Sequence, residues 1–132
     1  MDQGPLVMEE IDAGAELVRE FDRYRPVKAA FWLKISDENQ RYLYISSDQI
    51  DDTNFDIAYG EVLRLTGTIR SPYLDPFRVK VIGGDDPLTL AAVQVNRLFP
   101  GPMASRFGSK LFGGVFVDDG YIYQLPLSVN GD

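Results

Sequence analysis

The stretch VKAAFWLKISDENQRYLYISS, residues 27–47, indicates two β-strands joined by a polar turn. Apolar side chains occupy every second position of residues 27–36, which is typical of a half-buried strand. Residues 37–40 are polar and predict a turn, and residues 41–47 predict the return strand of a hairpin. The side chains expected to point inward are Val27, Ala29, Phe31, Leu33 and Ile35, and those expected to point outward are Lys28, Ala30, Trp32 and Lys34.

The register of this hairpin depends on the length of its loop. A five-residue loop pairs Ser36 with Tyr42 and places Leu43 and Ile45 on the inward face. A four-residue loop places Tyr42 and Tyr44 there instead, because a slip of one residue turns every side chain to the other face. We prefer the five-residue loop.

Three amphipathic helices are predicted around the hairpin. The first covers residues 8–24, where apolar side chains recur at helical spacing opposite acidic ones. The second covers residues 55–69 and follows Asp51-Asp52-Thr53-Asn54, all of which are residue types that cap helices. The third begins with Asp85-Asp86 as the cap and Pro87 in its first turn, and it continues to Phe99.

The remaining segments complete an α+β pattern. Residues 77–82 predict a strand with Phe77, Val79 and Val81 inward, and residues 100–114 predict a long loop. Residues 115–125 predict a hairpin that turns at Asp118-Asp119-Gly120. We therefore expect a single α+β domain over residues 1–132, with residues 1–7 flexible. Its order αββαβαββ combines three helices with a mostly antiparallel sheet of about five strands.

The composition restricts the chemistry. The 132 residues include no histidine and no cysteine, which removes the triads, zinc sites and dithiol centres that those residues build. We name no catalytic residue and expect no cofactor. No signal peptide and no stretch able to span a membrane is recognisable, so a cytoplasmic location is expected.

The net charge of −7 is concentrated at the N-terminus. Residues 1–22 hold seven acidic residues and one basic residue, whereas the rest of the chain is nearly neutral. Such a helix has either a solvated face that aids solubility or an acidic surface for a basic partner.

Paired aspartates are the candidates for a metal site. Asp51, Asp52 and Asp85 have the donor type that Mg²⁺ prefers, and Asp52, Asn54 and Asp56 imitate the start of an EF-hand loop. The match fails at Ile57, where that loop needs glycine, and at Leu63, where it needs glutamate. Helix capping and a hairpin turn account for the pairs without a metal, so we name no metal ligand. A Mg²⁺-dependent carboxylate enzyme stays an alternative if the pairs converge.

A second alternative is the binding of single-stranded nucleic acid on the outward face of the sheet. Aromatic side chains that stack on bases, interleaved with basic ones that meet phosphates, are typical of such binders. Ordinary cross-strand contacts account for the same residues, and the acidic total charge disfavours a polyanion. The residues of this predicted face are Trp32, Lys34, Tyr42, Tyr44, Arg78 and Lys80, with Lys28 beside them.

The C-terminal hairpin suggests a protein partner. Val115, Val117, Tyr121 and Tyr123 are expected on one of its faces, with Phe116 and Ile122 on the other. A hairpin that is apolar on both faces needs two coverings, and a second copy of the chain could supply one. A helix of the same chain behind the hairpin is the alternative. The candidate contact residues are Phe116, Tyr121, Ile122 and Tyr123.

The order of the segments resembles that of small bacterial proteins without a known activity. The resemblance lies in the VKAAFWL strand, the Ala58-Tyr59 helix, the Asp86-Pro87-Leu88 helix start and the closing GVFVDDGYIY segment. It implies a bacterial, intracellular protein and assigns no functional residue. From the residues we expect a non-catalytic interaction or regulatory module that forms a homodimer through the C-terminal hairpin.

Overall fold

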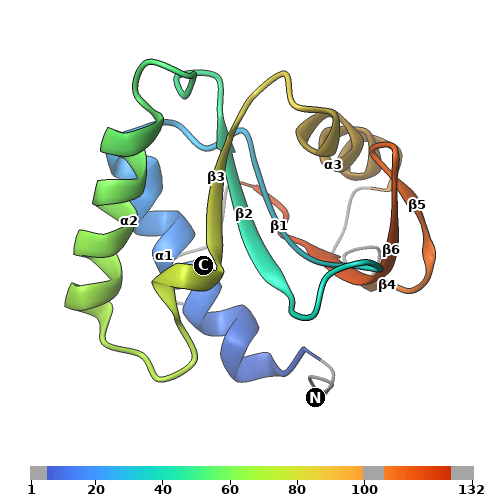
Figure 1. The fold of residues 1–132 in the computed structure, drawn as a ribbon, viewed down its shortest axis with the longest axis horizontal. Coiled ribbons are helices and arrows are strands. Elements are labelled where there is room, and N and C mark those ends of the chain that lie inside the picture. Colours follow the sequence, from blue (N-terminus) through green and yellow to red (C-terminus); the bar gives the residue numbers. More distant parts are fainter. Residues whose placement is uncertain (1–5, 100–105, 126–132) are drawn as a thin grey trace.

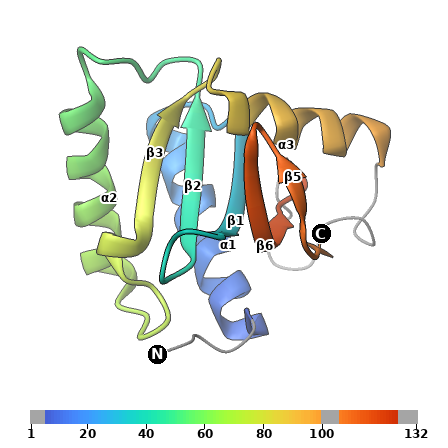
Figure 2. The same cartoon turned by 45° about the vertical axis from the view of Figure 1, so that its right-hand side comes forward.

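The computed structural model describes residues 6–99 and 106–125, and it confirms the predicted α+β fold. The described residues form one sheet in the order β3-β2-β1-β6-β4, with β5 paired to β6 (Figures 1 and 2). All pairings are antiparallel except that of β2 with β3, which are joined by the crossover helix α2. The strands are β1 (Ala29–Ile35), β2 (Tyr42–Ser47), β3 (Val79–Gly83), β4 (Arg106–Phe107), β5 (Lys110–Phe112) and β6 (Val115–Ile122).

The three helices lie where the sequence predicted them. They are α1 (Met8–Tyr24), α2 (Phe55–Ile69) and α3 (Pro87–Leu98). The Asp86 side chain caps α3 by accepting a hydrogen bond from the Leu88 backbone N–H at 2.9 Å, as expected. The N-cap of α2 is Asn54, so the prediction that Asp51 and Asp52 cap this helix is wrong.

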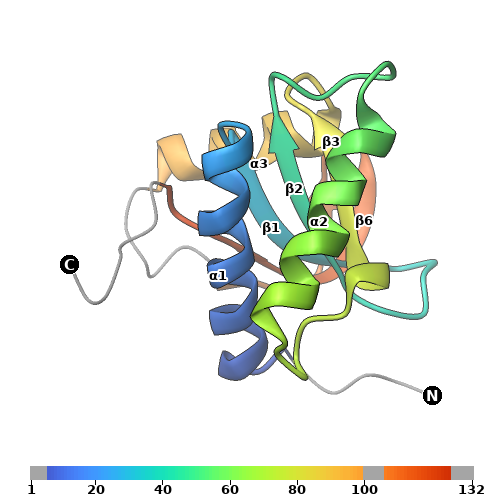
Figure 3. The same cartoon turned by 90° about the vertical axis from the view of Figure 1, so that its left-hand side faces the viewer.

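The sheet is covered on both faces, which corrects the prediction of a half-buried first strand. Figure 3 shows α1 and α2 side by side on one face and α3 behind the sheet. Residues from Ala29 to Leu33 are all buried. Ala30 and Trp32 pack in the core with α1 and α2, whereas Phe31 and Leu33 pack in the core with α3. The alternation in residues 27–36 therefore separates two cores, not a core from solvent.

The preferred register of the β1–β2 hairpin is wrong. Phe31 lies opposite Tyr44, and Trp32 lies opposite Leu43. The tyrosines of β2 therefore share the α3 face, as the alternative four-residue loop predicted. The observed pairing still differs from that of the four-residue loop, because Leu33 lies opposite Tyr42. Because both faces of β1 are apolar, burial alone did not distinguish the two choices. The ring of Tyr44 stacks on that of Phe31 at 5.3 Å between centroids.

The predicted turn at Asp118-Asp119-Gly120 is also wrong, because β6 runs through it without a break. Lys34 of β1 pairs with Asp119 and Ile35 pairs with Val117, so Asp118 is an extra residue in β6 and forms a β-bulge. The actual hairpin turns at Gly113 and Gly114, whose φ angles are 57° and 88°. Glycine adopts such angles without strain, and a Gly-Gly loop is a common hairpin signal. Gly113 and Gly114 belong to residues 100–114, the segment predicted as a loop.

Three smaller expectations also change. Pro76–Arg78 form the 3₁₀ turn η1, and Phe77 is 76% exposed instead of pointing inward. Residues 106–112 of the expected loop contain β4 and β5, while residues 100–105 lie outside the described residues. In the expected flexible segment, residues 1–5 lie outside the described residues and Leu6 is buried. No helix within the described residues is both long and apolar enough to cross a membrane.

Candidate functional site

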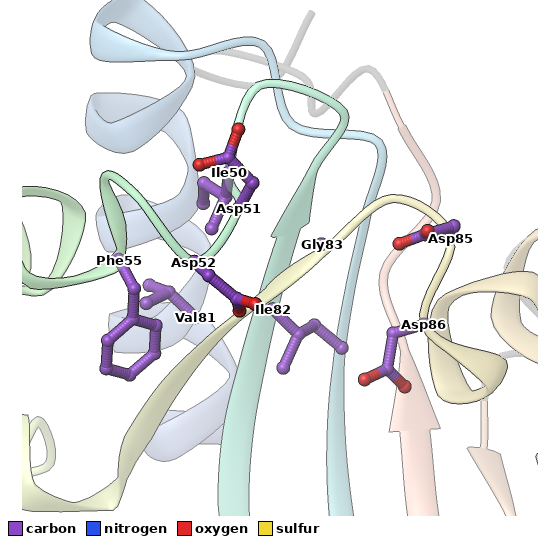
Figure 4. Close-up of a pocket in the computed structure, with 9 residues that line it drawn as sticks. All are labelled: Ile50, Asp51, Asp52, Phe55, Val81, Ile82, Gly83, Asp85 and Asp86. Atoms are coloured by element: carbon purple, nitrogen blue, oxygen red, sulfur yellow. The ribbon is translucent and has the colours of Figure 1, made fainter.

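A pocket of about 400 Å³ lies where the parallel strands β2 and β3 end. The loops that follow these strands lead to the N-termini of α2 and α3, and together they form the walls of the pocket. Ligands of open α/β sheets commonly bind at the carboxyl ends of parallel strands, in the same kind of position. We call it the acidic pocket, and it is lined by Ile50, Asp51, Asp52, Phe55, Val81, Ile82, Gly83, Asp85 and Asp86 (Figure 4).

The pocket joins two of the three predicted aspartate pairs. Asp51 and Asp52 approach from the β2–α2 loop, and Asp85 and Asp86 approach from the β3–α3 loop, with Ile82 between them in Figure 4. The candidates Asp51, Asp52 and Asp85 therefore surround one cavity, although Asp85 lies more than 30 residues from the other two in the sequence. Its apolar lining, formed by Ile50, Phe55, Val81 and Ile82, was not identified from the sequence.

The four carboxylates of the acidic pocket differ in their hydrogen bonds to other residues of the chain. Asp51 accepts hydrogen bonds from the hydroxyl and the backbone N–H of Thr53, and these bonds hold the pKa of its carboxyl below the ordinary value. Asp86 is engaged in capping α3. Asp52 and Asp85 are exposed, and neither takes part in a hydrogen bond or an ion pair with another described residue. Asp52 and Asp85 are therefore the carboxylates available to a ligand.

Lys28 links the two loops that form the walls of the pocket. Its ammonium donates to the Asp48 carboxylate and to the Gly84 carbonyl, both at 3.1 Å. Asp48 follows β2 and Gly84 follows β3, so one side chain links the two walls. Lys28 therefore belongs to the support of the pocket and not to a basic sheet face.

The spacing of the acidic side chains in residues 6–99 and 106–125 bears on a possible metal site. Within the described residues, no three acidic side chains come close enough together to hold a metal ion. The third pair, Asp118 and Asp119, lies far away in the bulge of β6. Hydrogen bonds from Ser36 and from Lys34 lower the pKa of the Asp118 carboxyl. The condition for a Mg²⁺ site, convergence of all three pairs, is therefore not met.

The predicted nucleic-acid face does not exist as one surface. The observed register places Trp32 in the core beneath α1 and α2 and places Tyr44 in the core beneath α3. Trp32 is 2% exposed and Tyr44 is 3% exposed, so neither ring is open to a base. The basic members have other contacts. Lys34 pairs with Asp118, Arg78 donates to Gln40, and the Lys80 ammonium lies 4.2 Å from the centroid of the Tyr42 ring.

The buried phenols make stability sensitive to alkaline pH. Burial raises the pKa of Tyr44 and of Tyr123 well above the ordinary value of about 10. In the unfolded chain both phenols ionise near that value, so stability is complete below it and falls as the pH rises above it. Urea unfolding followed by circular dichroism should show a smaller decrease between pH 9 and pH 11 for Tyr44→Phe than for the native chain. An equal decrease in both proteins would contradict this explanation.

The residues predicted for a dimer contact are mostly buried within the chain. Ile122 lies in the core with α3, and Tyr123 lies in the core with α1 and α2. Helices of the same chain therefore pack on both faces of this segment, as the alternative to a second copy predicted. Tyr121 is half-buried, and only Phe116 is exposed, opposite the exposed Leu111 of β5. The four residues do not form a common surface for a second copy.

Tyr123 has a structural role that the sequence did not indicate. Its hydroxyl accepts a hydrogen bond from the Trp32 indole N–H at 2.9 Å and donates one to the Ile11 carbonyl at 2.6 Å. This buried bridge joins β1, α1 and the end of β6.

Comparisons of the chain with protein-family models, with curated proteins and with solved structures found no match, so the function is inferred from the acidic pocket itself.

Proposed function

We propose that this protein is a non-catalytic binding module whose acidic pocket receives a cationic group carried on an apolar stem. The observation that supports this proposal is the composition of the pocket, in which apolar side chains and four carboxylates line the same cavity. Lysine and arginine side chains combine a charged head with a long apolar stem, so they complement both kinds of lining. The volume of about 400 Å³ lies within the range of ordinary ligand sites.

The hydrogen bonds of Asp51 argue against a general-acid role for this carboxyl. A general acid at neutral pH needs a raised pKa, whereas the pKa of Asp51 is lowered by its hydrogen bonds to Thr53. Ionised carboxylates spaced around a cavity suit a guanidinium group, whose donors point in several directions. The net charge of −7 adds a long-range attraction for basic partners.

A titration with agmatine, a guanidinium on a four-carbon stem that ends in an amine, tests this proposal. We expect shifts in ¹H–¹⁵N NMR spectra that are centred on Asp52, Ile82 and Asp85. The double variant Asp52→Asn, Asp85→Asn should bind agmatine about tenfold more weakly, which corresponds to about 1.4 kcal/mol. Both residues are exposed and take part in no hydrogen bond or ion pair with another described residue, so the variant should keep its native melting temperature.

Two controls make this result specific to the pocket. Asp118→Asn removes a carboxylate of equal charge from the distant bulge and should leave agmatine binding unchanged. Butylurea, which keeps the stem but lacks the charge, should bind much more weakly than agmatine. The proposal is wrong if agmatine shifts no pocket signal, or if the double variant binds it as tightly as the native chain does.

A further inference from the structure

We propose that the free edge of β3 receives an extended segment of a partner protein as an additional strand, with a basic side chain of that segment in the acidic pocket. This inference rests on the proposed function and specifies its partner as an extended basic peptide. The feature that supports it is the position of β3, which is both the edge of the sheet and one wall of the pocket.

One hydrogen-bonding edge of the β3 backbone has no partner strand within residues 6–99 and 106–125. β3 is the terminal strand of the sheet and pairs only with β2 within the described residues. Alternate N–H and C=O groups of an edge strand point away from its neighbour and can pair with another chain. Outside the sheet, none of the hydrogen bonds among the described residues involves the backbone of Lys80, Val81 or Ile82.

Within the described residues, this edge lacks two of the usual protections against strand addition, a bulge and a proline. Edge strands are commonly guarded by a bulge, by a proline or by an outward lysine. The pairing of β3 with β2 continues over five residues without a bulge. The ammonium of Lys80 is turned onto the sheet face, over the Tyr42 ring and 3.7 Å from the Glu38 carboxylate. At the opposite end of the sheet, by contrast, β4 and β5 contain only two and three residues.

The edge and the pocket are continuous, which determines the chemistry of the partner. Val81, Ile82 and Gly83 belong to β3 and line the acidic pocket as well. A strand added along β3 would therefore bring a side chain from one of its ends to Asp52 and Asp85. Because no described basic residue pairs with these two carboxylates, a basic side chain complements them. Backbone pairing would then provide affinity, and the pocket would provide specificity.

A set of synthetic peptides tests this inference on the unaltered protein. Two five-residue peptides of alternating threonine and valine carry one arginine, at the N-terminus in one peptide and at the C-terminus in the other. In a third and a fourth peptide, the alternate backbone amides that would pair with β3 are N-methylated. Isothermal titration calorimetry gives the affinities, and amide hydrogen exchange reports on Lys80, Val81 and Ile82.

We expect one arginine peptide to bind, its N-methylated form to bind at least about tenfold more weakly, and exchange at the outward amides of β3 to slow. Which of the two peptides binds gives the direction of the added strand. Equal affinity of the methylated and unmethylated forms, or peptide binding without slower exchange in β3, would overturn strand addition. If agmatine binds but no peptide does, this inference fails and the proposed function stands. If neither agmatine nor any peptide binds, both fail.

Discussion

Gly14→Ala is expected to lower the free energy of unfolding by about 2 kcal/mol or more. Alanine normally stabilises a helix relative to glycine by about 1 kcal/mol, so the expected sign is the reverse of the usual one. The reason is the position of Gly14 on α1, directly against the buried bridge formed by Tyr123. A Cβ atom at residue 14 would overlap the Tyr123 hydroxyl and would lie 3.1 Å from the indole nitrogen of Trp32.

The overlap cannot be relieved without breaking hydrogen bonds. The Tyr123 hydroxyl is held by both Trp32 and the Ile11 carbonyl, and moving it away leaves a buried donor and a buried acceptor with poorer partners. Gly60→Ala in α2 is the matched control, because an added Cβ would meet no atom within 4 Å apart from its chain neighbours and the backbone of its own helix. It should raise stability by about 0.5–1 kcal/mol.

Urea unfolding of the native chain and of both variants measures the two effects. The Gly14 variant should unfold at a lower urea concentration than the native chain, and the Gly60 variant at a higher one. A shift of the Gly14 variant to a higher urea concentration, like that expected of the Gly60 variant, would show that close packing at Gly14 does not limit the residue there.

Arg41→Met should lower the free energy of unfolding by about 3 kcal/mol. The side chain of Arg41 is only 4% exposed, and its guanidinium contacts both oxygens of Asp119, at 3.5 and 3.4 Å. A second carboxylate, that of Glu10 on α1, lies 4.0 Å away. Removal of the guanidinium leaves two partly buried carboxylates without this counter-charge, which costs more than the loss of an exposed ion pair.

Arg23→Met provides the comparison. Arg23 pairs with Glu20 at 3.7 Å on the surface of α1, where its side chain is 81% exposed, and its loss should cost no more than about 0.5 kcal/mol. Arg41→Lys keeps the charge but loses the two-pronged contact, so its stability should fall between those of the native chain and the methionine variant. A loss below about 1 kcal/mol for Arg41→Met, in the same urea assay, would mean that the buried pairing contributes little.

The candidate site shows where sequence reasoning worked and where it stopped. Asp51, Asp52 and Asp85, which the sequence offered only as metal candidates, all line the acidic pocket. Their convergence depends on the parallel pairing of β2 with β3, which is a long-range contact with no local signal. The predicted nucleic-acid face was wrong for a similar reason, because the observed register places Trp32 and Tyr44 on opposite faces of the sheet.

The sequence by itself determined the helices, the α+β class and the absence of histidine and cysteine chemistry. Helical periodicity, and at α3 the Asp86-Pro87 start, act within a few residues, so α1, α2 and α3 could be located without any tertiary contact. Tertiary structure alone decided the register of β1, the bulge in β6 and the meeting of two distant loops at one pocket. β1 is apolar on both faces and fits either register locally, so only the packing of α1 and α2 on one side and α3 on the other selects between them.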